Sequence, residues 1–189
     1  MPVIALGTAA DTNKSSEETT EVAVIEAIKL GYRHFDTASD LQLGLVKSIE
    51  ELFITSKLWP TNNFPHLVLP ALQKSLQGVW KGMEECQKLG LAKSIGVSNF
   101  TCKKLEDLLS FATIPPSVNQ VEMNPAWHQK KLKEIYDAKG IIITAFSPLG
   151  AKGASWGSNV VMGSEILKEI AEAHGRTIAQ VLKFSYSIN

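Results

Sequence analysis

Polar side chains stand at the carboxyl ends of five strand-like segments. In chain order they are Asp36, Thr37, Lys57, Ser98, Asn99, Gln120, Glu122 and Ser147. A carboxylate and an ammonium can pair, and amides and hydroxyls can donate and accept hydrogen bonds to a polar ligand. In parallel α/β barrels the carboxyl ends of the strands form the face that carries the active site. The set therefore indicates one polar site assembled from several strand ends.

Each residue of this set also has a structural alternative. Asp36 could cap a turn, Asn99 could begin the next helix, and Lys57 could be a solvated residue at the end of its strand. A single such residue would be structural more often than not. Because the pattern recurs at five strand ends, it favours a functional site.

Strand-like and helix-like segments alternate along the chain and would position these side chains. The predicted strands cover residues 32–37, 52–56, 93–98, 117–123 and 141–146. The predicted helices cover residues 16–30, 46–50, 66–77, 78–89, 101–111, 129–139, 163–174 and 177–186. Ser15 with Glu18 fits a capping box, and Gly31 stands where a glycine commonly ends a helix. Strands separated by helices favour parallel pairing in an α/β fold.

The amino-acid composition argues against several classes of protein. The 189 residues are 44% hydrophobic and 20% charged, which is typical of a single globular domain. Nineteen basic and nineteen acidic side chains cancel, so a nucleic-acid partner or a polybasic membrane patch is not expected. No apolar run approaches the roughly 18–20 residues of a membrane helix, and the start MPVIALGTAA lacks the basic segment of a signal peptide. Cys86 and Cys102 are expected to be reduced thiols in a cytoplasmic protein.

Several common motifs are absent from the sequence. There is no GxxxxGK[ST] or GxGxxG nucleotide fingerprint, no GxSxG elbow, and no HExxH or CxxC metal motif. The four histidines are scattered, so no metal site is expected. Gly150, Gly153 and Gly157 form a glycine-rich loop that is a weak phosphate signal, and a plain flexible loop is at least as good an interpretation.

Five blocks of sequence carry a family resemblance. They are GYRHFDTA (31–38), ELFITSKLW (51–59), GLAKSIGVSNF (90–100), PPSVNQVEMNP (115–125) and ITAFSPLG (143–150). In order and spacing they resemble the plant branch of the aldo-keto reductases. The resemblance implies a (β/α)₈ TIM barrel, NADPH as the cofactor, and a small aldehyde or ketone as the substrate that is reduced to an alcohol. It covers nearly the whole chain, so residues 1–189 are predicted to be one partial domain of this family.

The resemblance also implies roles for individual residues. Asp36 and Lys57 match the family's aspartate and lysine, which lower the pKa of a tyrosine acid. Ser98, Asn99 and Gln120 match the residues that bind the nicotinamide carboxamide. The remaining cofactor contacts implied are Thr37, Phe146 stacked on the nicotinamide ring, and Ser147 and Leu149 in a turn approaching the pyrophosphate.

The sequence departs from the family pattern at three places. No tyrosine lies between Tyr32 and Tyr136, and Asp40 cannot replace the acid because an ionised carboxylate only accepts hydrogen bonds. Residues 60–92 contain no strand ending in a histidine, and His66 lies in a stretch that relatives carry outside the active site. The chain also stops at Asn189, before the last two strands of the family. We therefore expect an incomplete barrel with about five of the eight strands.

These departures leave two functional hypotheses open. One is a carbonyl reductase of the family. The other is an inactive fragment, produced by splicing or a faulty gene model, that at most binds nucleotide weakly or associates with other subunits. If folded, the chain is expected to be a monomer prone to self-association, because open strand edges and zero net charge both favour aggregation. Trp59, Trp127 and Trp156 could line an apolar pocket or pack in the core.

Overall fold

The computed structural model describes residues 2–7, 17–36, 52–57, 68–153 and 157–188 of the chain. The chain divides into two compact units. The first unit holds residues 1–62 and 183–189, and the second holds residues 63–182. The prediction of one partial domain over residues 1–189 therefore stays a prediction.

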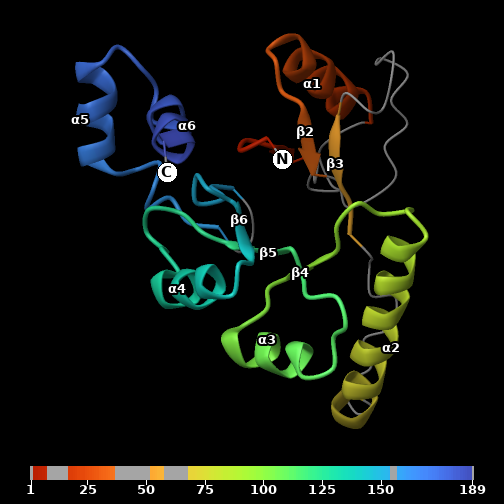
Figure 1. Ribbon diagram of the computed structural model, residues 1–189. Coiled ribbons are helices and arrows are strands. Elements are labelled where there is room, and N and C mark those ends of the chain that lie inside the picture. The colour runs from red at the N-terminus through yellow and green to blue at the C-terminus, as the bar shows by residue number, and fades with distance from the viewer. Residues whose placement is uncertain (1, 8–16, 37–51, 58–67, 154–156, 189) are drawn as a thin grey trace. The chain divides into compact units, whose positions relative to one another are not determined.

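The first unit contains a parallel sheet of very short strands and one helix. Strands β1 (Leu6–Gly7), β2 (His34–Asp36) and β3 (Phe53–Thr55) pair in the order β1-β2-β3, and helix α1 (Glu17–Lys29) lies beside β2 and β3 (Figure 1). The register places Asp36 opposite Thr55. A buried cluster of Val24, Ala27 and Phe35 joins the helix to the sheet. The carboxyl ends of β2 and β3 therefore share one edge of this sheet.

Gly31 ends α1 as the sequence predicts. Its φ of 91° is a left-handed backbone conformation that glycine adopts without a side-chain clash. Its N–H donates to the Ile28 carbonyl over 3.0 Å, and the Tyr32 N–H donates to the Ala27 carbonyl over 2.9 Å. This pair of bonds is a Schellman motif, which satisfies the last carbonyls of the helix and turns the chain into β2.

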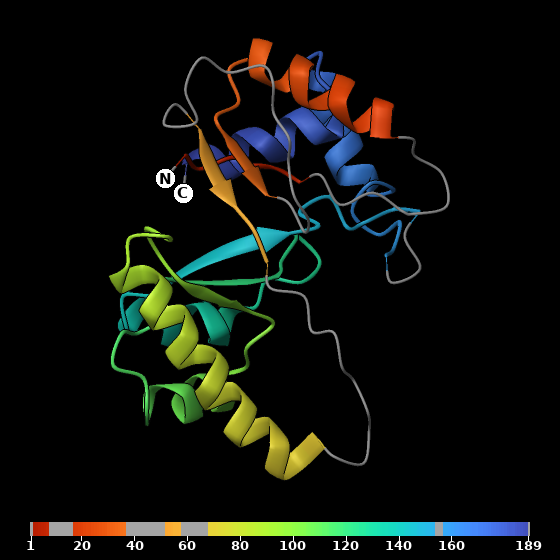
Figure 2. The same ribbon diagram turned by 90° about the vertical axis from the view of Figure 1, so that its right-hand side faces the viewer.

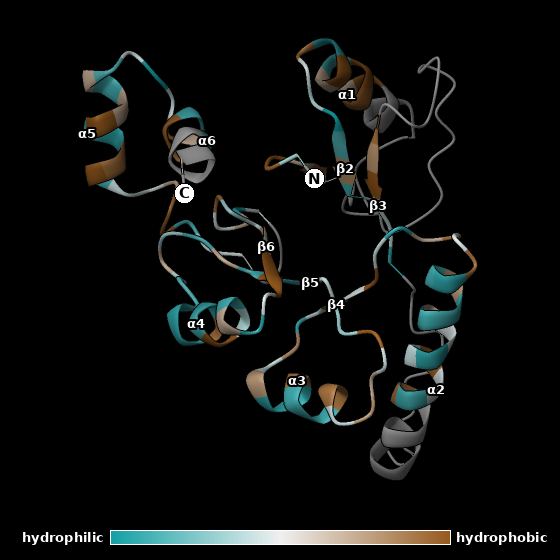
Figure 3. Cartoon of the chain, in the orientation of Figure 1, coloured by the Kyte–Doolittle hydropathy of each residue, from teal (hydrophilic) through white to brown (hydrophobic). Residues whose placement is uncertain are grey.

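The second unit contains a second parallel sheet with helices before, between and after its strands. The strands are β4 (Gly96–Ser98), β5 (Val118–Glu122) and β6 (Ile142–Phe146), in the order β4-β5-β6. The helices are α2 (Val68–Lys88), α3 (Cys102–Leu109), α4 (Lys130–Ala138), α5 (Glu165–Ala173) and α6 (Ile178–Ile188), the last of which continues into residues of the first unit. Helices α2, α3 and α4 lie on one side of this sheet (Figure 2). Residues of β6 are predominantly apolar (Figure 3), although β6 is the outer strand of this sheet, none of its residues is buried and Ile142 is 53% exposed.

Two buried clusters hold the second unit together. Trp80 of α2, Ile95 and Leu108 of α3 form one cluster. Leu105 of α3, Tyr136 of α4 and Ile141 form the other. The strands themselves approach closely at Gly96, where an added Cβ would collide with the Val118 side chain and lie 2.7 Å from the Val118 carbonyl oxygen. Only glycine fits there, and its register partner Val118 fixes Ser98 opposite Gln120 two residues later.

The predicted strands are confirmed, and the described residues add one more. Each of the five predicted segments contains an observed strand, β2 to β6. The additional strand, β1, has only two residues, too few to show an alternating pattern. The predicted helices at 66–77 and 78–89 form one helix, α2, because Pro70 lies in its first turn and Gly78 is tolerated inside it. The predicted helix at 46–50 and the capping residue Ser15 lie outside the described residues.

Candidate active site

An ion pair joins the two candidate catalytic residues of the first unit. Asp36 is the last residue of β2, and Lys57 follows β3 by two residues. Lys57 Nζ donates to Asp36 Oδ1 over 2.5 Å, with 31% of the lysine side chain and 17% of the aspartate side chain exposed. The parallel register of β2 and β3 brings the two side chains together, as the sequence predicts. The pair offers a cation, fixed in position and accessible to a ligand.

His34 supports this edge of the sheet from within β2. Its Nδ1 lies 3.1 Å from the Pro2 carbonyl oxygen, and its Nε2 lies 3.0 Å from the Thr55 hydroxyl oxygen. A carbonyl only accepts, so Nδ1 carries a hydrogen and donates to Pro2, and Nε2 makes the second hydrogen bond, with the Thr55 hydroxyl. Both nitrogens of this buried ring are occupied, so His34 ties β2 to β3 and is not a ligand-binding residue.

Ser98 and Asn99 stand at the carboxyl end of β4, in the second unit. The Ser98 hydroxyl donates to the Gln120 carbonyl over 3.0 Å, and the Asn99 N–H donates to the same oxygen over 2.9 Å. Asn99 has a φ of 57°, in the left-handed region. Asparagine visits this region more readily than most residues, but the conformation still costs on the order of 1 kcal/mol and concentrates at functional sites.

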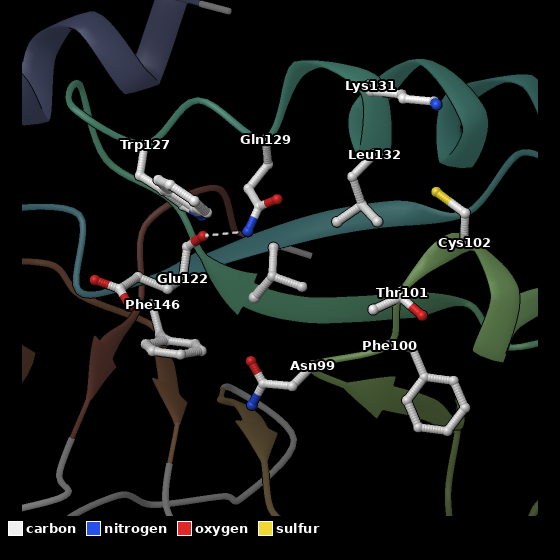
Figure 4. Close-up of a pocket in the computed structure, with 11 residues that line it drawn as sticks. Asn99, Phe100, Thr101, Cys102, Glu122, Trp127, Gln129, Lys131, Leu132 and Phe146 are labelled. Atoms are coloured by element: carbon white, nitrogen blue, oxygen red, sulfur yellow. Dashed lines mark hydrogen bonds between the residues drawn. The ribbon is translucent and has the colours of Figure 1, made fainter. Parts of the chain in front are cut away.

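Gln120 and Phe146 complete the strand ends of the second unit. The Gln120 side chain is only 7% exposed, and its register partners are Ser98 and Thr144. Phe146 ends β6 opposite Glu122. A hollow of about 490 Å³ opens beside these ends, and Asn99, Glu122, Phe146 and the 58% exposed Trp127 face it (Figure 4). The strand ends therefore present the Asn99 amide, the Glu122 carboxylate and the Phe146 ring to one hollow, and Trp127 adds a second ring, whereas Ser98 and Gln120 do not line it.

The segment after β6 forms a tight turn. The Gly150 N–H donates to the Ser147 carbonyl over 2.9 Å, and Ser147 has a φ of 50°. Leu149 is half-buried inside this turn. The glycine-rich loop closes on itself, since Ser158 N–H donates to the Gly150 carbonyl over 2.9 Å and a Cβ on Gly157 would collide with Ala151. The close contact with Ala151 explains why residue 157 is a glycine. Gly157 is therefore not evidence for a phosphate-binding loop.

A buried side-chain network that the sequence did not reveal lies behind Asn99. Asn119 of β5 is fully buried; its Nδ2 donates to the Phe100 carbonyl over 2.9 Å, and its Oδ1 accepts from the Phe100 N–H over 3.3 Å. The Tyr136 hydroxyl of α4 donates to the same carbonyl over 3.1 Å. Burial raises the pKa of Tyr136 to about 12, with a smaller contribution from the Cys102 thiol. Nothing in the spacing of residues 100, 119 and 136 predicts this convergence.

Tyr136 does not provide the proton donor that the sequence lacks. Its hydroxyl is buried and already donates to Phe100, and its pKa is moved away from neutrality. Thr37, Asp40, Trp59, His66 and Trp156 lie outside the described residues. The remaining predicted site residues fall into two sets, the Asp36–Lys57 pair in the first unit and Ser98, Asn99, Gln120, Phe146, Ser147 and Leu149 in the second.

The described residues contain no candidate metal-binding cluster and no candidate membrane-spanning helix. Among the residues that the structure describes, no three His, Cys, Asp or Glu side chains gather closely enough to hold a metal ion. Over the same ranges, no helix is long and apolar enough to cross a membrane.

The chain is similar in sequence to known proteins over most of its length. Residues 59–186 match the sequence model of the Aldo/keto reductase family. The chain is 50% identical to NAD(P)H-dependent 6'-deoxychalcone synthase of Glycine max over an alignment of 233 residues that covers 96% of this chain and 73% of the relative. It is 45% identical to NADPH-dependent codeinone reductase 1-4 of Papaver somniferum, covering 96% of this chain and 72% of that one. An alignment of 233 positions cannot be filled by 189 residues, so these relatives carry internal segments that have no counterpart here.

The comparison with solved structures agrees with the sequence comparison. A Bombyx mori aldo-keto reductase in complex with NADP matches with a TM-score of 0.77 and 32% identity, covering 96% of this chain and 75% of that one. A second match, Gox0644 in its apo form, has a TM-score of 0.73 and 30% identity, covering 96% and 73%. The similarity confirms the predicted fold class, an incomplete (β/α)₈ barrel to which the described residues contribute the six strands β1 to β6. Sequence and structure together show that this chain belongs to the aldo-keto reductase family.

Proposed function

We propose that this chain binds NADPH and reduces aldehyde or ketone carbonyls to alcohols by hydride transfer. The observation that carries the proposal is the ion pair between Lys57 and Asp36, the two residues that the resemblance matches to the family's catalytic lysine and aspartate. It places a partly exposed cation at the carboxyl edge of the β1–β3 sheet. The names of the relatives in soybean and opium poppy, which include NAD(P)H- and NADPH-dependent enzymes, support the same choice of cofactor.

The residues at the ends of β4, β5 and β6 fit a nicotinamide nucleotide by their chemistry. Asn99 and Gln120 carry amides, which complement the donor and acceptor of a carboxamide, and Ser98 adds a hydroxyl. Phe146 offers a flat ring for stacking. We assign Thr37 and the Ser147–Leu149 turn to the rest of the cofactor. NADPH would supply the hydride when bound.

Lys57 and Asp36 would act on the carbonyl oxygen of the substrate. Negative charge would develop on this oxygen as the carbon accepts the hydride, and the Lys57 ammonium would stabilise it by charge and hydrogen bonding. Water from the solvent would supply the proton that turns this oxygen into the alcohol hydroxyl. Asp36 holds the ammonium in place through its Oδ1. Because the sequence has no tyrosine between Tyr32 and Tyr136, we expect turnover to be slower by about 10²–10⁴-fold than in a relative with a positioned acid.

A second candidate function is nucleotide binding without turnover. The observation that favours it is the set of internal segments present in the relatives and missing here, together with the absent tyrosine. In this case the residues of the second unit would still bind NADPH. The chain would then neither bind nor reduce a carbonyl substrate.

One experiment separates the two candidates. Thermal unfolding of the purified chain is followed with and without saturating NADPH, and NADPH oxidation is then measured with simple aromatic and aliphatic aldehydes. A midpoint that rises with NADPH, plus aldehyde-dependent oxidation, supports the reductase, since only binding to the native state raises the midpoint. A rise without oxidation supports nucleotide binding alone. A midpoint indifferent to NADPH contradicts both.

We also propose that the chain is a cytoplasmic monomer that unfolds as one domain. Cys86 and Cys102 are free thiols, as expected in a reducing compartment. Zero net charge removes the repulsion that opposes association, so self-association is expected at high concentration. Sedimentation over a range of concentrations tests the monomer. A single cooperative transition in urea tests the single domain, and two separate transitions would contradict it.

A further inference from the structure

We propose that Asn119, assisted by Tyr136, is a positioning residue that holds the Ser98–Asn99 segment in the shape needed to bind the nicotinamide nucleotide. The inference rests on the proposed function, because it assigns a task to residues behind the proposed cofactor contacts. Neither side chain would touch the nucleotide. Both act through the backbone of Phe100, the residue that follows Asn99.

The hydrogen bonds around Phe100 satisfy both of its backbone groups from two different elements. Asn119 accepts from the Phe100 N–H and donates to the Phe100 carbonyl, so a single side chain of β5 bonds to both backbone polar groups of Phe100. Tyr136 adds a second donor to the carbonyl from α4. These bonds span 19 and 36 positions along the chain, so they fix the loop after β4 against the rest of the unit.

The backbone that this network holds is strained. Asn99 is left-handed, with a φ of 57°, and such a conformation persists only where the surroundings over-determine it. On its amino side, the Ser98 hydroxyl and the Asn99 N–H both donate to the backbone carbonyl of Gln120. On its carboxyl side, the bonds from Asn119 and Tyr136 hold Phe100. Asn99 is therefore pinned from both sides, and releasing one side should let its amide move.

The asparagine at position 119 has a structural task, because it satisfies both backbone groups of Phe100, and this task bears on the site because Phe100 follows Asn99. The side chain is fully buried in the middle strand of the sheet, where an apolar residue would pack without needing hydrogen-bond partners. Both of its polar atoms are directed to one residue, Phe100, next to the proposed carboxamide ligands. Because the raised pKa of Tyr136 keeps its hydroxyl protonated, the second donor is present over the whole neutral range.

The test measures NADPH affinity by calorimetry and the exchange of the Asn99 and Phe100 amide hydrogens by NMR without nucleotide. Asn119→Leu removes both bonds and keeps the branched shape and the number of side-chain heavy atoms. We expect NADPH to bind about tenfold more weakly and both amides to exchange faster. Tyr136→Phe keeps the ring and one donor to the carbonyl, so a weakening of about two- to fivefold is expected.

Trp80→Phe provides a matched control. Trp80 is also buried and donates one hydrogen bond to a loop carbonyl, that of Ile114, over 3.1 Å. Ile114 precedes β5, so this bond lies at the amino end of that strand, while the Phe100 side chain packs against the cluster that contains Trp80. The variant therefore disturbs packing near Phe100 without removing the hydrogen bonds to its backbone. The variant should lower the melting temperature while leaving NADPH affinity and the Asn99 amide unchanged.

The outcomes separate the inference from the proposed function. If the parent chain binds no NADPH, the proposed function fails, and amide exchange in the Asn119 variant alone decides whether this residue holds the segment. If the parent binds and Asn119→Leu binds equally well, or Trp80→Phe weakens binding as much, the inference is overturned. Should Asn119→Leu not fold, Tyr136→Phe decides, and parental affinity with parental exchange overturns the inference.

Discussion

The two units hold their candidate site residues by different interactions. In the first unit, strands of two and three residues carry a charged pair, and Lys57 remains 31% exposed beside Asp36. In the second, the five-residue strand β5 carries the neutral amides of Asn119 and Gln120, and buried hydrogen bonds from Asn119 fix the backbone of Phe100 after β4. A partly exposed cation stays accessible to a reacting atom, whereas a buried neutral network holds the backbone around it in a fixed shape. The first arrangement suits chemistry and the second suits recognition.

The largest expected effect comes from breaking the charged pair. Lys57→Met should lower aldehyde reduction by about 10²–10⁴-fold, because it removes the cation beside the carbonyl oxygen. NADPH affinity should stay the same, since the proposed nicotinamide contacts are in the second unit. The loss of folding stability should stay within about 1 kcal/mol, as is usual for pairs that water reaches. Steady-state kinetics, calorimetry and urea unfolding measure the three quantities.

The second unit supplies a matched control for this prediction. Lys133 of α4 pairs with Asp137 over 2.9 Å, but both side chains are more than half exposed. Lys133→Met removes the same charge and should leave kcat and KM unchanged. Equal losses in the two variants would show that the position of the Lys57 charge is unimportant.

The next effect tests how tightly the second unit is packed. Gly96→Ala places a Cβ against Val118 and its carbonyl oxygen, so β4 must move away from β5. We expect a loss of about 1–3 kcal/mol in the free energy of unfolding, measured in urea. Gly82→Ala is the control, because nothing lies within 4 Å of its added Cβ on α2. It should stabilise the protein by about 1 kcal/mol, and a stable Gly96→Ala would contradict the close approach.

Aromatic stacking in the second unit gives a smaller effect. Phe146→Leu keeps an apolar side chain but removes the ring, and should weaken NADPH binding by about 2- to 10-fold. Phe146→Tyr retains the ring and should bind as the parent does. Phe111→Leu changes a phenylalanine packed on the Trp80 cluster and should leave the affinity unchanged. Calorimetric titration checks all three, and parental affinity in Phe146→Leu would remove Phe146 from the proposed contacts.

The sequence predicted features that depend on neighbours along the chain. Gly31 ends α1 where the pattern indicated. Asp36 and Lys57 meet because Asp36 ends β2 and Lys57 follows the end of β3, the parallel strand beside it. Contacts between distant elements gave no such signal. The hydrogen bonds between Asn119 and Phe100 depend on three-dimensional packing, and no pattern of residue spacing along the chain predicts them. Strand β1 was missed because two residues cannot show a period.

The smallest expected effect at neutral pH concerns a buried carboxylate of the second unit. Glu84 of α2 accepts the Ile114 and Thr113 N–H groups at 2.9 and 2.7 Å, and these bonds, led by that of Ile114, lower the pKa of its carboxyl although burial opposes them. A lowered pKa means that the native state binds the proton less readily than the unfolded state does. The stabilisation is therefore complete above the ordinary value of about 4.5 and is lost as the pH falls through the lower native value.

Glu84→Gln should remove this acid sensitivity. Its amide oxygen can still accept from Thr113 and Ile114, so at neutral pH the urea midpoint should fall only slightly, through loss of the charge. Below about pH 4.5 the parent should lose stability more steeply than the variant, and the two curves should converge. Glu106→Gln on the exposed side of α3 makes the same charge change without these partners, and its curve should run parallel to that of the parent. If Glu84→Gln also runs parallel, the carboxylate does not need its charge to hold the loop before β5, and the second unit relies on neutral hydrogen bonds there as well.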